Sequence, residues 1–291
     1  MPDPVRHPSH LLGYASKAWR NLGPLVAAAF LALVVTLAIL APWLPIADPL
    51  DADPSKRIAA IGTHDLWLGG DNQGRDILAR LIWGARISLA IAVAPTLVAT
   101  LVSLFLGIAA GYHGRWLDHI IMRTLDVFFA FPLVLLAIAI AGILQPGVLT
   151  EIVAITVVLV PYVTRVARTS AGQVASQTYI EAARASGASV GALLLRYVLP
   201  NAAPPVLVYA TTLCGLMIVV GSGLSFLGLG VQPPAADWGA MVADGGVVLR
   251  KAAHATLLPG LMIVLAALAF STLGEALREA LDPRSNRRRS S

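Results

Sequence analysis

A polar, helix-prone island of 23 residues, Tyr179 to Asn201, interrupts the long apolar stretches of this sequence. Alanine, glutamate, arginine and leucine favour helix, so the pattern predicts a short helix over Tyr179–Ser186 that Gly187 ends or bends. A second short helix over about Val190–Tyr197 should end before Pro200, which a helix interior does not accommodate. The result would be a compact two-helix knob, although an ordinary amphipathic loop could contain the same residue types.

Patterns for catalysis, nucleotide binding and metal binding are missing from the sequence. There is no Gly-x4-Gly-Lys-Ser/Thr phosphate loop, and none of the lysines follows a glycine. The Gly-x-Ser-x-Gly and His-Glu-x-x-His patterns are absent, and the single Cys214 cannot form a disulfide within the chain. We therefore expect no catalytic residue, no metal site and no cofactor in this chain, so any ATP hydrolysis must take place on another polypeptide.

The composition predicts that the elements positioning this island are membrane spans. Hydrophobic residues make up 57% of the 291 residues, and the mean hydropathy is +0.76. Charged residues make up 13%, about half of the roughly 25% in a soluble domain. The net charge of +5 is spread along the chain, which fits membrane orientation better than nucleic-acid binding. We predict an all-α integral membrane protein.

Six apolar runs, each near the length of about 20 residues that a membrane helix needs, are predicted to span the bilayer. The first is too long for a cleavable signal peptide and lacks a cleavage site. The fifth must tilt or bend, most readily at Gly221-Ser222-Gly223, and Gly107-x-x-x-Gly111 in the second would let a neighbouring helix approach closely. The predicted spans are about 22–44, 87–112, 119–143, 148–168, 202–231 and 252–273, within a transmembrane domain over 22–275.

The remaining segments are assigned to the two sides of the membrane by their charge. Residues 1–21 form an N-terminal segment, 179–201 the loop between the fourth and fifth spans, and 276–291 a basic tail. If the termini are inside, 14 of the 21 lysines and arginines are internal, so the positive-inside rule places both termini and the loop in the cytoplasm. In the long external segment, Asp71–Trp83 is predicted to be helical with Asp71 or Asn72 as its cap.

An ion-coupled transporter is an alternative that the acidic residues disfavour. Such a protein usually keeps a carboxylate, histidine or lysine deep in the membrane. Here every acid is predicted at a helix end or in a loop, and the deepest, Asp126, has Arg123 three positions away as a pairing partner. Backbone carbonyls could still bind sodium, so ion coupling stays open.

The spacing in the polar island resembles a known family motif. Glu-Ala-Ala, three residues, Gly, nine residues, Ile, one residue and Leu-Pro is typical of the cytoplasmic loop in membrane subunits of binding-protein-dependent ABC importers; here Tyr197 stands for the isoleucine. Three other passages, Leu68–Asp76, Gly223–Gly245 and Leu273–Arg284, resemble the dipeptide, oligopeptide and nickel branch of these permeases. The similarity covers about residues 22–284 and is greatest to the second of that branch's two permease subunits.

This resemblance implies a permease subunit that forms half of the pore of an ATP-driven importer in the inner membrane. The polar island would contain the coupling helix, which docks on an ATPase subunit, with Glu181 capping or pairing in its cleft or else remaining solvated. The implied partners are a second permease, two ATP-binding subunits that hold ATP and Mg, an extracytoplasmic solute-binding protein and the lipid bilayer. The residues implied in docking are Tyr179, Glu181, Ala182, Ala183, Arg184, Gly187, Leu199 and Pro200.

Short peptides, as dipeptides or oligopeptides, are the substrate class that the resemblance favours. Nickel and glutathione are alternatives within the same importer class. An ion-coupled secondary transporter and a non-transporting membrane scaffold are alternatives of other kinds. The small residues of the fifth span are expected to line the pore, namely Gly215, Gly221, Ser222 and Ser225.

Overall fold

The structure, a computed structural model, is built from helices. It describes residues 9–281, with side chains described from residue 22 onward. No β-strand occurs in this part of the chain, which confirms the predicted all-α fold class. Some of the arginines assigned above to the inner side of the membrane lie outside the described residues, namely Arg6, Arg284 and Arg287–Arg289. The helices are α1 (Ser9–Leu40), α2 (Ile77–His113), α3 (Arg115–Asp126), α4 (Leu133–Ile143), α5 (Val148–Ala175), α6 (Thr178–Ala185), α7 (Val190–Leu193), α8 (Leu199–Phe226), α9 (Trp238–Gly246) and α10 (His254–Leu281).

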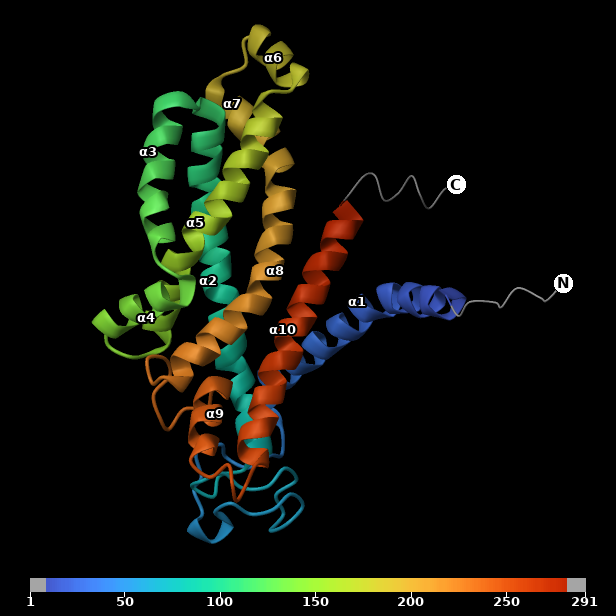
Figure 1. Cartoon of the computed structure of the whole chain (residues 1–291), viewed down its shortest axis with the longest axis vertical. Coiled ribbons are helices and arrows are strands. Elements are labelled where there is room, and N and C mark those ends of the chain that lie inside the picture. The colour runs from blue at the N-terminus through green and yellow to red at the C-terminus, as the bar shows by residue number, and fades with distance from the viewer. Residues whose placement is uncertain (1–8, 282–291) are drawn as a thin grey trace, which may run out of the picture.

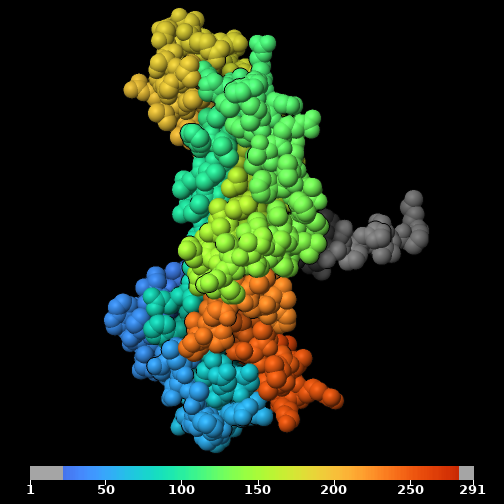
Figure 2. All heavy atoms as spheres, turned by 90° about the vertical axis from the view of Figure 1, so that its left-hand side faces the viewer, coloured from blue at the N-terminus to red at the C-terminus, as the bar shows by residue number. Residues whose placement is uncertain are grey.

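The long helices run side by side along an elongated molecule (Figures 1 and 2). Helices α2, α5, α8 and α10 make up the bundle, and α1 packs against α10 and α2. Helix α6 lies at one end, which we call the α6 end. Helix α9 and the segment 44–76 lie at the opposite end, which we call the α9 end. Among the described residues, five helices are long and apolar enough to cross a membrane, or six if α3 and α4 form one broken span.

The third predicted span is interrupted, and Pro132 is the physical reason. Instead of one helix over 119–143, the chain forms two helical segments, Arg115–Ala130 and Leu133–Ile143, at an angle of 90°. Phe131 and Pro132 between them are extended. A residue that precedes proline is pushed out of the helical region by the pyrrolidine ring, so the helix ends here despite the apolar sequence.

The predicted helix over Asp71–Trp83 begins later than expected. Asp76 caps α2 by accepting a hydrogen bond of 2.8 Å from the Leu78 amide, and α2 then continues without interruption to His113. Residues before Asp76 form a turn instead, because Gly74 has a positive φ of 84° that a helix does not permit. Asp71 accepts amide hydrogen bonds within this turn rather than capping a helix.

The second helix of the predicted knob does not end before Pro200. Helix α7, a π-helical turn over Leu194–Val198 and α8 follow one another directly, so that Pro200 lies in the first turn of α8. The wider π-helical turn precedes the proline, whose ring would clash with the fourth preceding carbonyl in a regular helix. Helix α8 continues without a break through Gly221-Ser222-Gly223 to Phe226.

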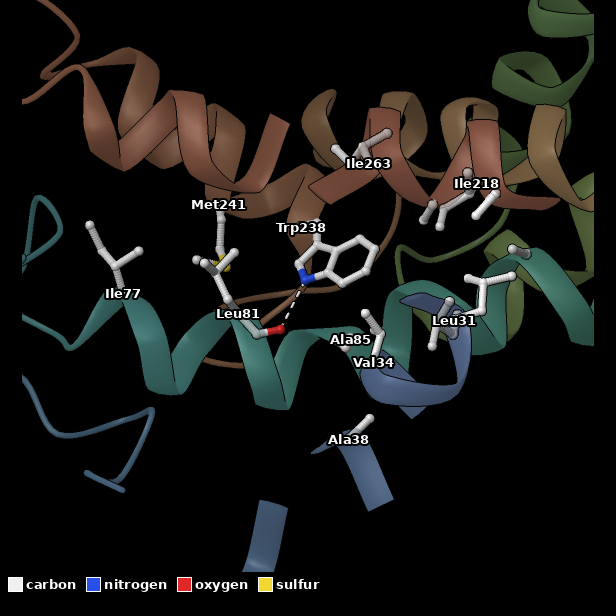
Figure 3. Close-up of a cluster of buried hydrophobic side chains, with 14 of the residues drawn as sticks. Leu31, Val34, Ala38, Ile77, Leu81, Ala85, Ile218, Trp238, Met241 and Ile263 are labelled. Carbon is white, nitrogen blue, oxygen red and sulfur yellow. Dashed lines mark hydrogen bonds between the residues drawn. The ribbon is translucent and has the colours of Figure 1, made fainter. Parts of the chain in front are cut away.

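Buried side chains form three apolar clusters along the bundle. The cluster at the α9 end centres on Trp238, whose indole Nε1 donates to the Leu81 carbonyl at 3.0 Å (Figure 3). Toward the α6 end, α2 and α5 are in backbone contact, as expected from the Gly107–Gly111 pattern. A methyl group on Gly107 would lie 2.7 Å from the Arg168 backbone nitrogen, so only glycine permits this approach.

Candidate functional site

Helix α6 projects from one end of the molecule (Figure 1), and it follows α5 and precedes α7 in the chain. Tyr179, Glu181, Ala182 and Arg184 are exposed, and Ala183 is half-buried. Glu181 lies in the first turn and Arg184 in the last, where a carboxylate and a guanidinium each complement the helix dipole. The helix therefore presents a small surface that combines one acid, one arginine and the Tyr179 ring.

A single buried side chain anchors α6 to the bundle. Ile180 is fully buried and belongs to the third apolar cluster, with Ile108 from α2, Ala171 from α5 and Val198 and Ala202 from the other side of the island. Leu199 packs against the same cluster, whereas Pro200 is exposed. Most of the predicted docking residues thus lie on the exposed surface of α6, whereas Leu199 packs against the apolar cluster beneath it.

Arg184 contacts the bundle rather than pointing only to solvent. Its Nη2 lies 3.3 Å from the Tyr112 hydroxyl, and its guanidinium carbon lies 5.6 Å from the centre of the Tyr112 ring. Tyr112 belongs to the last turn of α2. Arg184 therefore links α6 to α2, which is a role in positioning that spacing in the sequence did not indicate.

Gly187 ends α6 as the sequence predicts. Its φ is +87°, the Ala188 amide donates to the Ala183 carbonyl at 3.1 Å, and the Gly187 amide donates to the Arg184 carbonyl at 3.0 Å. These two hydrogen bonds form a Schellman motif, in which the left-handed position favours glycine. Nothing lies within 4 Å of where a Cβ would stand, so backbone conformation alone requires glycine here.

The four residues predicted to line a pore are buried at helix contacts in this conformation. Gly215 faces α10, where a methyl group would meet the Ala267 carbonyl at 2.6 Å. Gly221 faces α2 and α5, and Ser222 lies against Gly239 of α9. Ser225 contacts α5. Their role in a pore stays a prediction.

Glu151 is a buried carboxylate to which the sequence reasoning assigned no role. It lies in the first turn of α5 with no exposed surface, and the Ser225 hydroxyl of α8 donates to its carboxylate oxygens at 3.3 and 3.4 Å. Gly221 and Gly230 leave space for it: a methyl group on Gly230 would lie 3.0 Å from the Glu151 Cδ. Glu151 therefore joins the start of α5 to the end of α8, which are the ends that lie away from the α6–α7 segment.

A buried cluster of four charged residues closes the α9 end. Arg75 is 2% exposed and contacts Asp71 (Nε–Oδ2 2.6 Å) and Asp244 (Nη2–Oδ2 3.0 Å). Arg80, 1% exposed, lies 3.5 Å from the same Asp71 oxygen. Two arginines and two aspartates balance in charge, and they join the segment 44–76 to α2 and α9.

Two ion pairs join α3 to α5 between the α6 end and the middle of the bundle. Asp126 pairs with Arg165 of α5 at 2.5 Å, not with Arg123 as predicted. The Arg168 guanidinium forms a bidentate ion pair with the Asp118 carboxylate, and its Nη2 lies 2.6 Å from Oδ2. The predicted partner failed because the bundle brings a second arginine to Asp126 from another helix. Across the described chain, no cluster of three or more metal-ligating side chains is present.

A family model and several proteins of related sequence match this chain. A family model described as "Binding-protein-dependent transport system inner membrane component" matches residues 103–287. The glutathione transport system permease protein GsiD of Pectobacterium atrosepticum is 39% identical over 270 residues, 91% of this chain and 90% of that protein. The dipeptide transport system permease protein DppC of Alkalihalophilus pseudofirmus is 38% identical over 250 residues, 86% of this chain and 82% of that protein.

Solved structures with the same fold are more distant in sequence. A chain of the MetNI methionine ABC transporter, in an inward-facing conformation, aligns with a TM-score of 0.54 at 18% identity, covering 69% of this chain and 97% of that one. A chain of an amino acid ABC transporter aligns with a TM-score of 0.54 at 16% identity, covering 70% and 95%. These matches concern the arrangement of the helices.

Proposed function

Because this chain belongs to the family of binding-protein-dependent transport system inner membrane components, we propose that it forms half of the translocation pore of an ATP-driven importer for short peptides. The observation that carries this proposal is helix α6. It is short, exposed and supported by one buried anchor, Ile180, with Glu181 and Ala182 facing outward. Such a helix can dock in a cleft of another protein and pass a displacement to α5 and α8.

The ATPase-docking surface comprises the outward residues of α6 together with the turn that follows. Tyr179, Glu181 and Ala182 would contact the ATPase, Ala183 would permit close approach, and Gly187 would set the corner. Leu199 would support the helix from within, beside Pro200. ATP and Mg would be bound by two ATPase subunits, and ATP-driven closure of these subunits would move α6 and alternate access to the pore.

The orientation that fits this function puts the α6 end and both termini in the cytoplasm. The excess of lysine and arginine in the segments assigned to that side supports it. A solute-binding protein would then approach the α9 end from outside the inner membrane. A second, homologous permease would supply the other half of the pore.

Short peptides are the proposed substrates because of the relatives with high coverage, one named for dipeptides and one for glutathione. Glutathione is itself a short peptide, so one pathway would suit both. Nickel is the alternative within the branch, and the absence of a metal-ligating cluster from the described residues does not favour it. Gly215, Gly221, Ser222 and Ser225 are proposed to reach the pore only when the helices separate.

Uptake into vesicles tests the proposal. The chain is reconstituted with its candidate partners, and uptake of a labelled dipeptide is measured with and without ATP in the presence of a protonophore. We expect ATP-dependent uptake that survives the protonophore and is lost when the ATPase subunits lack their phosphate-binding lysine. Uptake that collapses with the proton gradient would contradict ATP coupling. If the ATPase is active but no dipeptide is taken up, the substrate would be glutathione or nickel, and uptake of each is measured in parallel.

A further inference from the structure

A charged pocket of about 440 Å³ lies between α3 and α5. Its lining residues all belong to these two helices, and most of them are ionisable. The Asp126–Arg165 and Asp118–Arg168 pairs lie along it, and the Arg165 side chain is 47% exposed. Arg123 also lines the pocket and has no ion pair or hydrogen bond within the described part of the chain.

Contacts with α2 show that this charged surface lies at the depth of membrane-spanning sequence. The Ser103 hydroxyl donates to the Val160 carbonyl at 3.1 Å, and Gly107 packs against the backbone of Arg168. Arg165 lies between these two levels of α5. Residues of α2 at the same depth expose large apolar side chains, with Leu101 61% and Phe105 76% exposed. At this depth the exposed surface of α2 is therefore apolar, whereas the surface of α3 and α5 is charged.

Charged side chains at this depth do not face acyl chains, because their exposure to hydrocarbon is costly and they turn instead to protein or to water-filled cavities. The α3–α5 face must therefore meet water or protein. Leu101 and Phe105 on α2 suit the lipid.

The break between α3 and α4 also requires protein or a water-filled cavity beside it. The Phe129 ring packs on Tyr162 with centroids 4.7 Å apart, which places the break beside the middle of α5. Helix α4 has 11 residues and spans about 16 Å, too little to cross a hydrocarbon core of about 30 Å. Exposed, extended backbone at Phe131 follows Ala130, and at membrane depth such backbone occurs only inside protein or beside a water-filled cavity.

We propose that the α3–α5 face, from Asp118 to Phe131 and along Arg165 and Arg168, lines the water-filled translocation pathway, with Arg123 meeting the carboxylate of a passing peptide. Three arginines against two aspartates leave the pocket with a positive charge, which suits a peptide or glutathione carboxylate and repels a nickel cation. This inference rests on the proposed function, and it assigns the pathway to α3 and α5 in addition to the small residues of α8.

Cysteine labelling tests the location of the pathway. In a Cys214→Ala background, Met122→Cys and Thr169→Cys lie in the pocket, and Leu101→Cys and Phe105→Cys are matched positions at the same depth on α2. A charged thiosulfonate reagent should react at least about tenfold faster at the pocket positions, because it does not enter hydrocarbon. ATP turnover with a dipeptide should slow the reaction at these positions.

Equal rates at all four positions would overturn the inference, as would pocket cysteines whose reactivity is unchanged by turnover. Labelling of the resting complex does not require transport, so the two proposals can fail separately. The expected labelling in a complex without dipeptide uptake would count against the substrate class. Uptake in a complex whose pocket cysteines are unreactive would count against the pathway alone.

The role of Arg123 has its own test in the assembled importer. Arg123→Gln should lower the rate of dipeptide uptake by about tenfold, through loss of one charge-assisted hydrogen bond, and Arg123→Lys should restore most of it. Arg278→Gln, which removes an exposed arginine from the last turn of α10, is the control. Uptake by Arg123→Gln equal to that of the control would overturn the assignment of a carboxylate contact.

Discussion

The two ends of this molecule are stabilised in opposite ways. At the α6 end an exposed helix is held by one buried isoleucine, Ile180, and by an exposed contact between Arg184 and Tyr112. At the α9 end two arginines and two aspartates form a largely buried cluster beside a fully buried tryptophan. The comparison teaches that the element proposed to receive motion is weakly held, whereas the segment 44–76 is fixed to the bundle by buried charges.

Removing a charge from the α9 end should produce the largest effect. Arg75→Met leaves the cluster with two aspartates and one arginine, and breaking a buried pair costs about 3–5 kcal/mol. Thermal unfolding of the purified protein in detergent would show this loss in the free energy of unfolding. Lys56→Met is the control, because its pair with Asp53 is exposed and is worth less than about 1 kcal/mol. Equal effects of the two variants would mean that the cluster does not lock this end.

Gly187→Val should have the second largest effect and should act at the α6 end. A side chain at a positive φ costs about 1–2 kcal/mol, and the open space around Gly187 means that only the helix end is disturbed. We expect unchanged membrane insertion and weaker co-purification with the ATPase. Gly191→Val, exposed and without a positive φ, is the matched control. Unchanged co-purification of Gly187→Val would contradict the docking geometry.

Glu181→Ala should weaken docking less than this. The carboxylate is exposed on the first turn of α6, and one such charge contributes up to about 1 kcal/mol, or about fivefold in affinity for the ATPase. Binding of the ATPase to the permease in nanodiscs measures it. Glu275→Ala removes an exposed carboxylate from α10 as control, and a loss of affinity equal to this control would assign Glu181 to solvated surface.

The smallest expected effect concerns the support of α6. Tyr112→Phe keeps the ring beneath Arg184 and removes the hydroxyl, which is worth about 0.5–1 kcal/mol. Amide exchange in α6 should become a few-fold faster, because its opening free energy falls by this amount. Tyr197→Phe is the control, since its hydroxyl makes no hydrogen bond in the described structure. Exchange rates that match the control would show that Ile180 alone holds the helix.

Local features of the α6 end could be predicted from the sequence because they depend on neighbouring residues. Gly187 closes a hydrogen-bonded motif whose members lie within six positions, and helix propensity indicated α6 itself. The break at Pro132 was also visible in principle, since a proline restricts the residue before it. The apolar residues on both sides of Pro132 favoured one continuous span, although Arg123 and Asp126 lie near its start.

Contacts at the α9 end could not be predicted, because they join residues far apart in the chain. Ser225 meets Glu151 from 74 positions away, and Arg75 meets Asp244 from 169 positions away. The local pairing of Arg75 with an acid is confirmed by Asp71, four positions before it, but nothing in the sequence near Asp244 identifies Arg75 as its partner. The same holds for the pairing of Asp126 with Arg165, where tertiary packing replaced the local partner Arg123.

The separation of Arg75 from Asp244 has a consequence for the synthesis of the protein. Arg75 and Asp71 emerge from the ribosome early, whereas Asp244 follows only after α8 has been made. Until then the cluster holds two arginines and one aspartate, and the segment 44–76 lacks its contact with α9. Final packing at this end therefore waits until Asp244 has been made, and a chain that stops short of Asp244 retains an unbalanced buried charge.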